Sequence, residues 1–414
     1  MNIYVWGIGR IAEKICGTLR CEPAGFVDSN KENWGREFCG RVVHAPQDMF
    51  DGKLPHPDCI ILSARTYEGI VYHIGQLHRD GKTPKILPFW GEDEPSENDI
   101  SEIIDKKEWR IAVLEERLRA LEKRLSMRLA NYGYEFADRI NRTGYWFPRI
   151  RDSGEAVEKI VNEGCSLIRF GDGEFEIMAG KNRAPFQECE DDLSLRLRET
   201  VNVVHPKILI AIADNYGELS KYTDTVADGI RAYMTDDVRR FHASVLQPDR
   251  TYYDAYLFKA YLPYRDKSFT KKRVERMKRI WEKRDVVLIE GEFTRTGYGN
   301  DLMDNAKSIR RILCPTKNAW GKYERILEEA RKADRENLIL IALGPAGKVL
   351  AYDLARIGFQ AVDIGQADMD YDWQIAGVGQ RVPNPWKYVS QLPPTEIREV
   401  SDARYLSQVI VRIA

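Results

Sequence analysis

The chain has few of the side chains that bind transition metals and none of the long apolar segments that enter membranes. Its 414 residues include six histidines, no H-E-x-x-H motif, and seven scattered cysteines without a C-x-x-C pair. A zinc site is therefore not expected, and the cysteines suit reduced thiols in a cytosol. No apolar run approaches the roughly 20 residues of a membrane helix, and the N-terminus lacks the pattern of a signal peptide. We expect a soluble, cytoplasmic protein without a transmembrane segment.

An excess of positive charge is also lacking. Lysine and arginine number 63 against 64 acidic residues, which gives a formal net charge of −1. This balance argues against a general nucleic-acid binder but allows a small anionic ligand held by a few local cations. The length is too great for one ordinary core, so two or three domains are expected.

Residues 1–98 are expected to form a Rossmann-like accessory domain. Apolar runs at 3–6, 24–27 and 59–63 surround a turn of the form Gly7-x-Gly9-x-x-Ala12, and the second run ends at Asp28. Such glycines let a pyrophosphate approach a helix start, and the acid can bind ribose hydroxyls, although many half-domains of this kind bind nothing. The segment resembles the N-terminal domains of bacterial sugar acyltransferases. An NAD-dependent dehydrogenase is a further reading, but NAD is not expected, because no hydride-transfer residues are recognisable.

Residues 99–132 are expected to form a helical linker, because residues 103–130 contain neither glycine nor proline. Apolar residues recur there at the 3,4 spacing of a coiled-coil seam: Ile111, Leu114, Leu118, Leu121 and Leu125. In a parallel homodimer through residues 109–129, the flanking charges would attract as Arg110–Glu115′ and Arg117–Glu122′. Arg128 interrupts the seam, and an amphipathic helix packing on its own domain is the alternative.

Residues 133–414 alternate apolar runs with helical stretches, which predicts an α/β domain with a mostly parallel sheet. The runs are 207–213, 285–291, 338–343 and 360–365, and helices are expected around 157–161, 323–333 and 349–357. In such sheets ligands bind beyond the carboxyl ends of the strands. Four loops should share that rim: those that begin at Gly171, Gly291, Gly344 and Gly365.

The first of these loops carries two carboxylates, Asp172 and Glu174, on either side of Gly173. In an extended segment residues i and i+2 point to the same side, so both carboxylates could converge on one point. Two hard oxygen ligands suit Mg²⁺ or Mn²⁺, which keep further positions for water and phosphate oxygens. The alternative is an Asp-Gly turn beside a solvated glutamate.

The other loops supply groups that bind phosphate. Arg295 has the fork geometry that holds phosphate oxygens, and Asp301 is expected to cap a helix that starts there. The segment Gly344-Pro345-Ala346-Gly347-Lys348 opens a helix, whose free N–H groups suit a diphosphate. Together the loops predict a metal-bridged diphosphate site.

Three long blocks resemble the bacterial GT-D-type glycosyltransferases. They are RFGDGEFEIMAG, VVLIEGEFTRTGYGNDLMDNAKSIRRILCPTKNAW and LIALGPAGKVLAYDLARIGFQAVDIGQADMDYDW, within roughly residues 150–375. The resemblance implies a GT-D-like domain over 133–414, with a UDP-sugar donor (UDP-glucose first) and a bacterial surface glycan or glycoprotein as acceptor. It also implies metal ligands (Asp172, Glu174) and donor-binding residues (Arg169, Gln187, Arg295, Asn300, Asp301), with Gly173 inside the first motif and the helix start at Gly344 and Gly347 beside the diphosphate. An inverting transfer would also need a carboxylate base, for which Glu290, Glu292 and Asp368 are candidates.

The chain departs from the family pattern near its end. GPAGK stands where the pattern has GPTAT, Gln366 replaces a histidine, and Asp370 and Asp372 replace glutamates. These departures motivate an alternative from another class, a degenerate scaffold or regulatory protein displayed on a coiled-coil dimer. A nucleotidyl or phosphoryl transferase at the same site is the second alternative enzyme.

Overall fold

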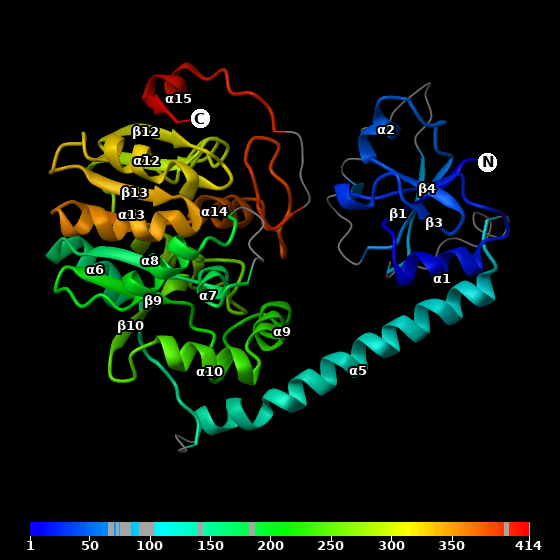
Figure 1. The fold of residues 1–414 in the computed structure, drawn as a ribbon, viewed down its shortest axis with the longest axis horizontal. Helices are drawn as coiled ribbons and strands as arrows, with labels where there is room; N and C mark the ends of the chain where they lie inside the picture. The colour runs from blue at the N-terminus through cyan, green and yellow to red at the C-terminus, as the bar shows by residue number, and fades with distance from the viewer. Residues whose placement is uncertain are drawn as a thin grey trace. The chain divides into compact units, whose positions relative to one another are not determined.

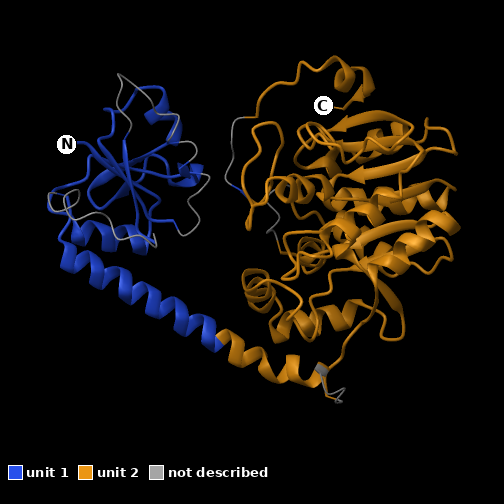
Figure 2. Ribbon diagram, turned by 180° about the vertical axis from the view of Figure 1, so that it is seen from behind, with its two compact units in different colours: residues 1–126, 392–394 blue, residues 127–391, 395–414 orange. Residues whose placement is uncertain are grey.

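The computed structural model describes residues 1–64, 70, 71, 74, 84–90, 103–139, 144–181, 187–392 and 397–413. The chain forms two compact units, one mainly Met1–Ser126 and the other Met127–Gln391 with Thr395–Ala414 (Figure 2). The domain boundary expected near residue 98 lies outside the described residues. No helix in the described part of the chain is both long and apolar enough to cross a membrane.

The first unit is built on a six-stranded sheet with the order β3-β4-β2-β1-β5-β6. Only the β3–β4 pair is antiparallel. The strands are β1 (Ile3–Trp6), β2 (Gly25–Val27), β3 (Glu37–Phe38), β4 (Arg41–His44), β5 (Cys59–Leu62) and β6 (Lys85–Pro88). Its described helices include α1 (Arg10–Thr18), the 3₁₀ turn η1 (Lys31–Asn33), α2 (Pro46–Phe50) and the first part of α5 (Lys106–Arg139). The three apolar runs expected near the N-terminus are therefore strands of one sheet.

The glycine-rich turn between β1 and α1 is held by Asp28. Its carboxylate accepts hydrogen bonds from the backbone N–H of Ile8 at 3.0 Å and of Asn30 at 2.7 Å. A side chain at Gly7, where φ is +93°, would place Cβ 2.4 Å from Ser63 Oγ, so this position needs glycine for packing. One Asp28 oxygen therefore holds the glycine-rich turn and the other holds the turn after β2, so the acid has a structural use in both.

The second unit is built on a nine-stranded sheet, parallel throughout, with the order β15-β12-β11-β13-β14-β8-β9-β10-β7 (Figure 1). Helices cover both faces, and alternate residues of β8 enter two separate apolar clusters, Leu167 in one and Ile168 in the other. The strands are β7 (Arg149–Arg151), β8 (Ser166–Phe170), β9 (Ile208–Ile212), β10 (Thr251–Asp254), β11 (Asp285–Gly291), β12 (Ser308–Cys314), β13 (Leu338–Ala342), β14 (Gln360–Asp363) and β15 (Val409–Arg412).

The helices of this unit lie in the crossover connections between its parallel strands. They are α6 (Ser153–Glu163), α7 (Asp172–Met178), α8 (Asp191–Val201), α9 (Asp224–Tyr233), α10 (Asp236–Val245), η2 (Ala255–Phe258), α11 (Thr270–Lys278), η3 (Ala319–Lys322), α12 (Tyr323–Ala330), α13 (Gly344–Arg356), α14 (Ala367–Ile375) and α15 (Ala403–Gln408). The prediction of a helix that starts at Asp301 is wrong. Residues 301–307 form turns, and the chain then enters β12, which pairs with β11 and β15.

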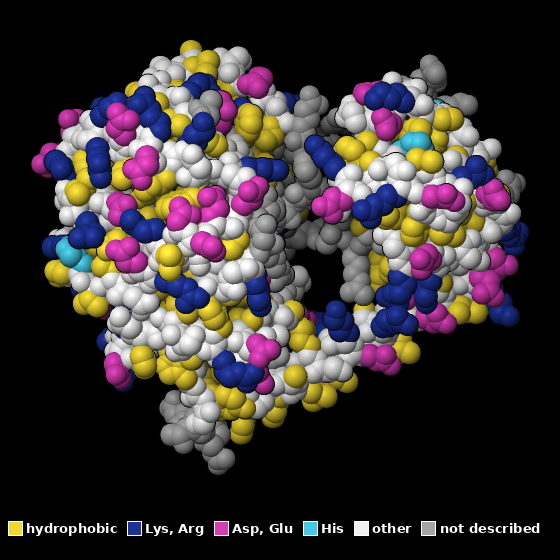
Figure 3. Space-filling model, viewed as in Figure 1, with side chains coloured by type: hydrophobic (Ala, Val, Ile, Leu, Met, Phe, Trp, Pro, Cys, Tyr) yellow, Lys and Arg dark blue, Asp and Glu magenta, His cyan; other side chains and the backbone are white. Residues whose placement is uncertain are grey.

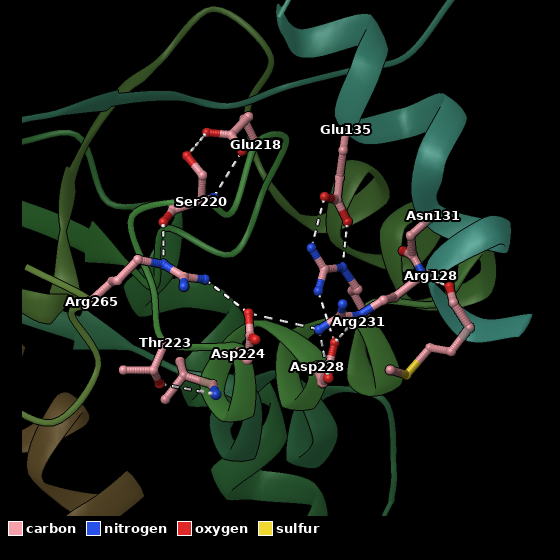
Figure 4. Close-up of polar contacts among 12 residues, drawn as sticks. Arg128, Asn131, Glu135, Glu218, Ser220, Thr223, Asp224, Asp228, Arg231 and Arg265 are labelled. Carbon is pink, nitrogen blue, oxygen red and sulfur yellow. Dashed lines mark hydrogen bonds and ion pairs between the residues drawn. The ribbon is translucent and has the colours of Figure 1, made fainter. Parts of the chain in front are cut away.

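The helix predicted around residues 103–130 is present as α5 (Lys106–Arg139), whose last part belongs to the second unit. Charged pairs fasten this part to α9 (Figure 4). The guanidinium of Arg128 donates to Asp228 at 2.9 Å, and Arg231 donates to Glu135 at 2.7 Å. Arg128, which breaks the predicted seam, is thus used for attachment to the second unit.

Candidate active site

The two carboxylates that follow β8 lie on a helix, not on an extended segment. Helix α7 begins at Asp172, and Glu174 at its third position accepts a hydrogen bond from the backbone N–H of Gly171 at 2.8 Å. Successive residues of a helix are turned by about 100°, so the two side chains leave the axis in nearly opposite directions. Asp172 is exposed, whereas Glu174 is 7% exposed. The predicted convergence of both carboxylates on one point is therefore wrong.

Glu174 belongs to a buried group of four charges, here called the charge cluster: Arg169, Glu174, Lys348 and Asp363. Lys348 Nζ, from α13, lies 3.4 Å from Glu174 Oε1 and 3.1 Å from Asp363 Oδ2. Burial alone would raise the pKa of Asp363, but Arg169 and Lys348 outweigh it and hold that pKa below its ordinary value. The cluster joins the carboxyl ends of β8 and β14 to the start of α13.

Arg169 is committed to the protein backbone. Its Nε donates to the carbonyl of Asp363 at 2.7 Å, and its Nη1 donates to the carbonyl of Ala255 at 3.2 Å. Its guanidinium also lies 5.0 Å from the ring centre of Phe258. The residue therefore ties β8 to β14 and η2, a positioning role in place of the donor contact that the family resemblance implies.

Arg295 is likewise turned inward. It is buried, and its Nη1 donates to the carbonyls of Trp386 at 2.9 Å and Arg398 at 2.6 Å. Its φ of +50° is unusual for a residue with a side chain. This guanidinium fixes the C-terminal segment against the loop after β11, and its predicted phosphate contact stays a prediction.

The same loop is anchored to α14 by Asp368. Its Oδ1 accepts from the backbone N–H of Gly297 at 2.7 Å and from Asn300 Nδ2 at 2.8 Å. Lys387 Nζ lies 2.5 Å from Asp368 Oδ2 and 2.8 Å from Asp372 Oδ2. Burial raises the pKa of Asp368 even though Lys387 opposes the shift. Asn300 and Asp368 thus lie together, as expected for two loops on the same rim of the sheet. They are hydrogen-bonded to each other.

The remaining base candidates are also paired. Glu290 is buried between Arg311 Nη1 at 2.5 Å and the backbone N–H of Thr296 at 2.8 Å. Glu292 accepts from Arg412 at 2.6 Å. Asp301 does not cap a helix; its carboxylate accepts from Tyr371 at 2.6 Å and from Lys278 at 3.0 Å.

The remaining predicted donor-binding residues are three glycines and Gln187, and their surroundings differ. A side chain at Gly347 would place Cβ 2.9 Å from Ile341 Cγ2, so this glycine lets α13 pack against β13. Gly344 begins α13 with φ of +57°. Gln187 Oε1 accepts from the backbone N–H of Trp320 at 3.2 Å, whereas a Cβ at Gly173 would meet no atom within 4 Å.

Two groups on the rim were not singled out by the sequence patterns. In the sequence Lys348 is only the last residue of the GPAGK helix start. In the structure it supplies the ammonium of the charge cluster. Asp254, at the carboxyl end of β10, has its pKa raised to about 7 by burial and by the nearby Asp214. A lone aspartate at a strand end carries no sequence signal, and only the fold places it beside a second acid.

The residues do not fit the predicted metal clamp. Both oxygens of Glu174 already have partners, one of them an ammonium, and Asp172 points elsewhere. Among the residues that the structure describes, no three His, Cys, Asp or Glu side chains are placed to hold a metal ion. The arrangement that remains is an exposed carboxylate, Asp172, at the start of α7, two residues before the Glu174 that belongs to the buried charge cluster.

A parallel sheet with charged groups at the carboxyl ends of its strands is the architecture of α/β enzymes that bind their substrates at that rim. A family model of the glycosyltransferase GT-D fold matches residues 167–392, more than half of the chain. The chain belongs to this glycosyltransferase family, as the three long blocks of its sequence suggest.

Known proteins support this assignment. The chain is 31% identical over 262 residues to a protein named probable glycosyl transferase Gly from Streptococcus gordonii, and 31% identical over 267 residues to glycosyltransferase GlyD from Streptococcus pneumoniae serotype 4. These matches cover 63% and 64% of this chain but 38% and 32% of those proteins, so the chain spans about a third of their length.

Solved structures agree over the same region. A structure described as a new glycosyltransferase (domain of unknown function 1792) from Streptococcus sanguinis has a TM-score of 0.61 and 29% identity, and the match covers 65% of this chain and 100% of that one. A second, described as a highly conserved domain with a distinct glycosyltransferase fold, has a TM-score of 0.62 and 29% identity, with 64% and 96% covered.

Proposed function

We propose that the protein transfers a hexose from a nucleoside diphosphate sugar to a glycan. UDP-glucose is the first donor to test, and the acceptor is a sugar of a bacterial surface glycan or glycoprotein. The observation that carries the proposal is the exposed carboxylate of Asp172 at the carboxyl end of β8 in a GT-D domain, on the same helix as Glu174, which pairs with Lys348 of α13. The free N–H groups of a helix start favour a bound diphosphate. We propose a cytoplasmic location, where nucleotide sugars are made.

The transfer breaks the bond between the anomeric carbon and the diphosphate and forms a bond to the acceptor oxygen. The departing diphosphate gains negative charge, which groups already in place must stabilise. Glu290 and Asp368 are held in buried ion pairs, so they are poor candidates to face the reacting sugar, whereas the pair of Glu292 with Arg412 is exposed and weak. We propose that Asp172 faces it instead.

The test is a transfer assay with a panel of nucleotide sugars and released UDP as the readout. Asp172→Ala should lower kcat/KM by about 100-fold or more, the usual effect of removing a group that acts in the transition state. Asp191→Ala is the matched control, because Asp191 is also an exposed first residue of a helix, α8. Equal activity of wild type and Asp172→Ala would contradict the assignment of Asp172.

Product analysis separates the other candidate functions. A nucleotidyl or phosphoryl transferase would leave a nucleotide or phosphate on the acceptor, whereas sugar transfer releases the intact nucleoside diphosphate. A folded protein that binds no nucleotide sugar would favour the scaffold reading. The first unit is proposed as an accessory module, and its Asp28 contacts give no support to an NAD site.

We also propose a parallel homodimer through α5. Leu118 and Leu121 on its seam are 58% and 60% exposed, and Figure 3 shows hydrophobic side chains along this helix. The apolar stripe continues past the predicted seam, because Leu129 and Tyr132 are exposed as well. A second copy of the same helix would cover this stripe. Glu115 is used within one chain, by Lys14 at 2.5 Å, so the predicted Arg110–Glu115′ pair would compete with that contact.

A further inference from the structure

We propose that Lys348 is the fixed cation of the donor site, and that its ammonium takes the place of a divalent metal ion at Glu174. The diphosphate of the nucleotide sugar is the ligand it would serve. This inference rests on the proposed function, and it names the ammonium that would contact the leaving diphosphate.

The first support is the geometry around Glu174. Its Oε2 accepts from the backbone N–H of Gly171 at 2.8 Å, and its Oε1 lies 3.4 Å from Lys348 Nζ. Lys348 also reaches Asp363 Oδ2 at 3.1 Å, so two buried carboxylates hold the ammonium in one place. A metal ion at Glu174 would have to displace an ammonium that the surrounding protein fixes.

The second support is the charge balance. The charge cluster contains two cations, Arg169 and Lys348, and two anions, Glu174 and Asp363, all buried. Buried charges are tolerated when they are paired, and these four pair with one another without any added ion. A divalent ion would add two positive charges that the described members of the cluster do not compensate.

The third support is the position of Lys348 on its helix. It lies one turn after Gly344, where α13 begins, and no side chain caps this helix start. Long side chains on a helix lean toward its N-terminus. The ammonium and the free N–H groups of α13 therefore belong to the same end of the helix, where a diphosphate would bind.

In this site the electron pair of the broken bond leaves with the nucleoside diphosphate, while the acceptor hydroxyl oxygen bonds to the anomeric carbon and gives up its proton to the carboxylate of Asp172. Lys348 and the start of α13 stabilise the charge on the diphosphate, and they are neither consumed nor changed. The transfer then needs no divalent ion.

The test begins with Mn²⁺ alone. Titration of the full chain with MnCl₂, followed by electron paramagnetic resonance of the free ion, should show no stoichiometric binding. Binding of one Mn²⁺ that disappears in Glu174→Gln would overturn the proposal. This readout does not depend on knowing the sugar, so it also stands if the proposed function is wrong.

The second arm is transfer in EDTA. Wild-type activity in EDTA should equal that in Mn²⁺, and Lys348→Met should lower kcat by about 100-fold or more. Lys348→Arg, which keeps the charge, should retain a large share of the activity, and thermal unfolding of each variant checks that it is folded. Loss of wild-type activity in EDTA with recovery in Mn²⁺ would overturn the inference while leaving glycosyl transfer standing. Absence of transfer in both conditions would instead contradict the proposed function.

Discussion

Replacing Lys387 by methionine should destabilise the second unit measurably. Its side chain is 1% exposed, and its ammonium lies between the carboxylates of Asp368 and Asp372. Removing one member of a buried ion pair leaves an uncompensated charge and costs about 3–5 kcal/mol. For a unit of about 285 residues, the entropy of unfolding is about 0.6 kcal/mol/K, so Tm should fall by about 5–8 °C. Differential scanning calorimetry at pH 8 measures this shift.

The loss of stability caused by Lys387→Met should be smaller at lower pH. Burial already raises the pKa of Asp368, and loss of the ammonium raises it further, so the carboxyl group takes up a proton as the pH falls and its buried charge disappears. Lys271→Met is the control, because that lysine side chain is 87% exposed on α11. Adding Asp372→Asn to Lys387→Met should restore part of the stability. A Tm within about 1 °C of wild type at pH 8 would refute the reasoning, since that corresponds to well under 1 kcal/mol.

Two further predictions concern proton uptake and assembly. Asp254, whose pKa is raised to about 7, binds its proton more tightly in the folded protein, so this group costs the protein stability as the pH rises from about 4 to 7. Asp254→Asn removes that cost and should gain about 2 kcal/mol more at pH 8 than at pH 5 in chemical denaturation; an equal effect at both values would contradict the raised pKa. Replacing the exposed Leu118 and Leu121 together by glutamate should convert a dimer to a monomer in sedimentation without loss of helicity; a monomeric wild type, or an unchanged dimer, would count against the coiled coil.

The strands of the large sheet could be predicted because burial on both faces leaves an uninterrupted apolar run. The run 285–291 coincides with β11, and those at 207–213 and 338–343 contain β9 and β13. Strands β7, β10, β12 and β15 were not predicted; in β7 and β12 the reason is an arginine-rich sequence that does not resemble a buried apolar run. In β12 the buried Arg311 is paired with Glu290, a partner that the local sequence does not show.

The location of the site was predictable, but the use of its residues was not. The rule for parallel sheets places Asp172, Asn300 and Asp368 on one rim from strand positions alone. The direction of each side chain depends on where a helix begins and on partners far away in the chain. Gly171 follows the last residue of β8 and is the N-cap residue of α7. Because the helix starts there, Glu174 points inward to Lys348. In the local sequence Arg295 has the features of a phosphate ligand. In the fold its guanidinium contacts carbonyls of the C-terminal segment, which lies about 100 residues further along the chain.

The departure of this chain at GPAGK has a physical consequence at the same place. A divalent ion bound by Glu174 would lie near Lys348, whose ammonium is 3.4 Å from that carboxylate. At a separation of about 4 Å and an effective dielectric constant of about 20, a double and a single positive charge repel by about 8 kcal/mol. That repulsion opposes a metal ion at Glu174 unless Lys348 moves away or loses its proton. Asp363 opposes both changes, because it attracts the same ammonium at 3.1 Å. The GPAGK sequence at the start of α13, which departs from the family pattern, therefore supplies its own cation through Lys348 and is consistent with a diphosphate site without a metal ion.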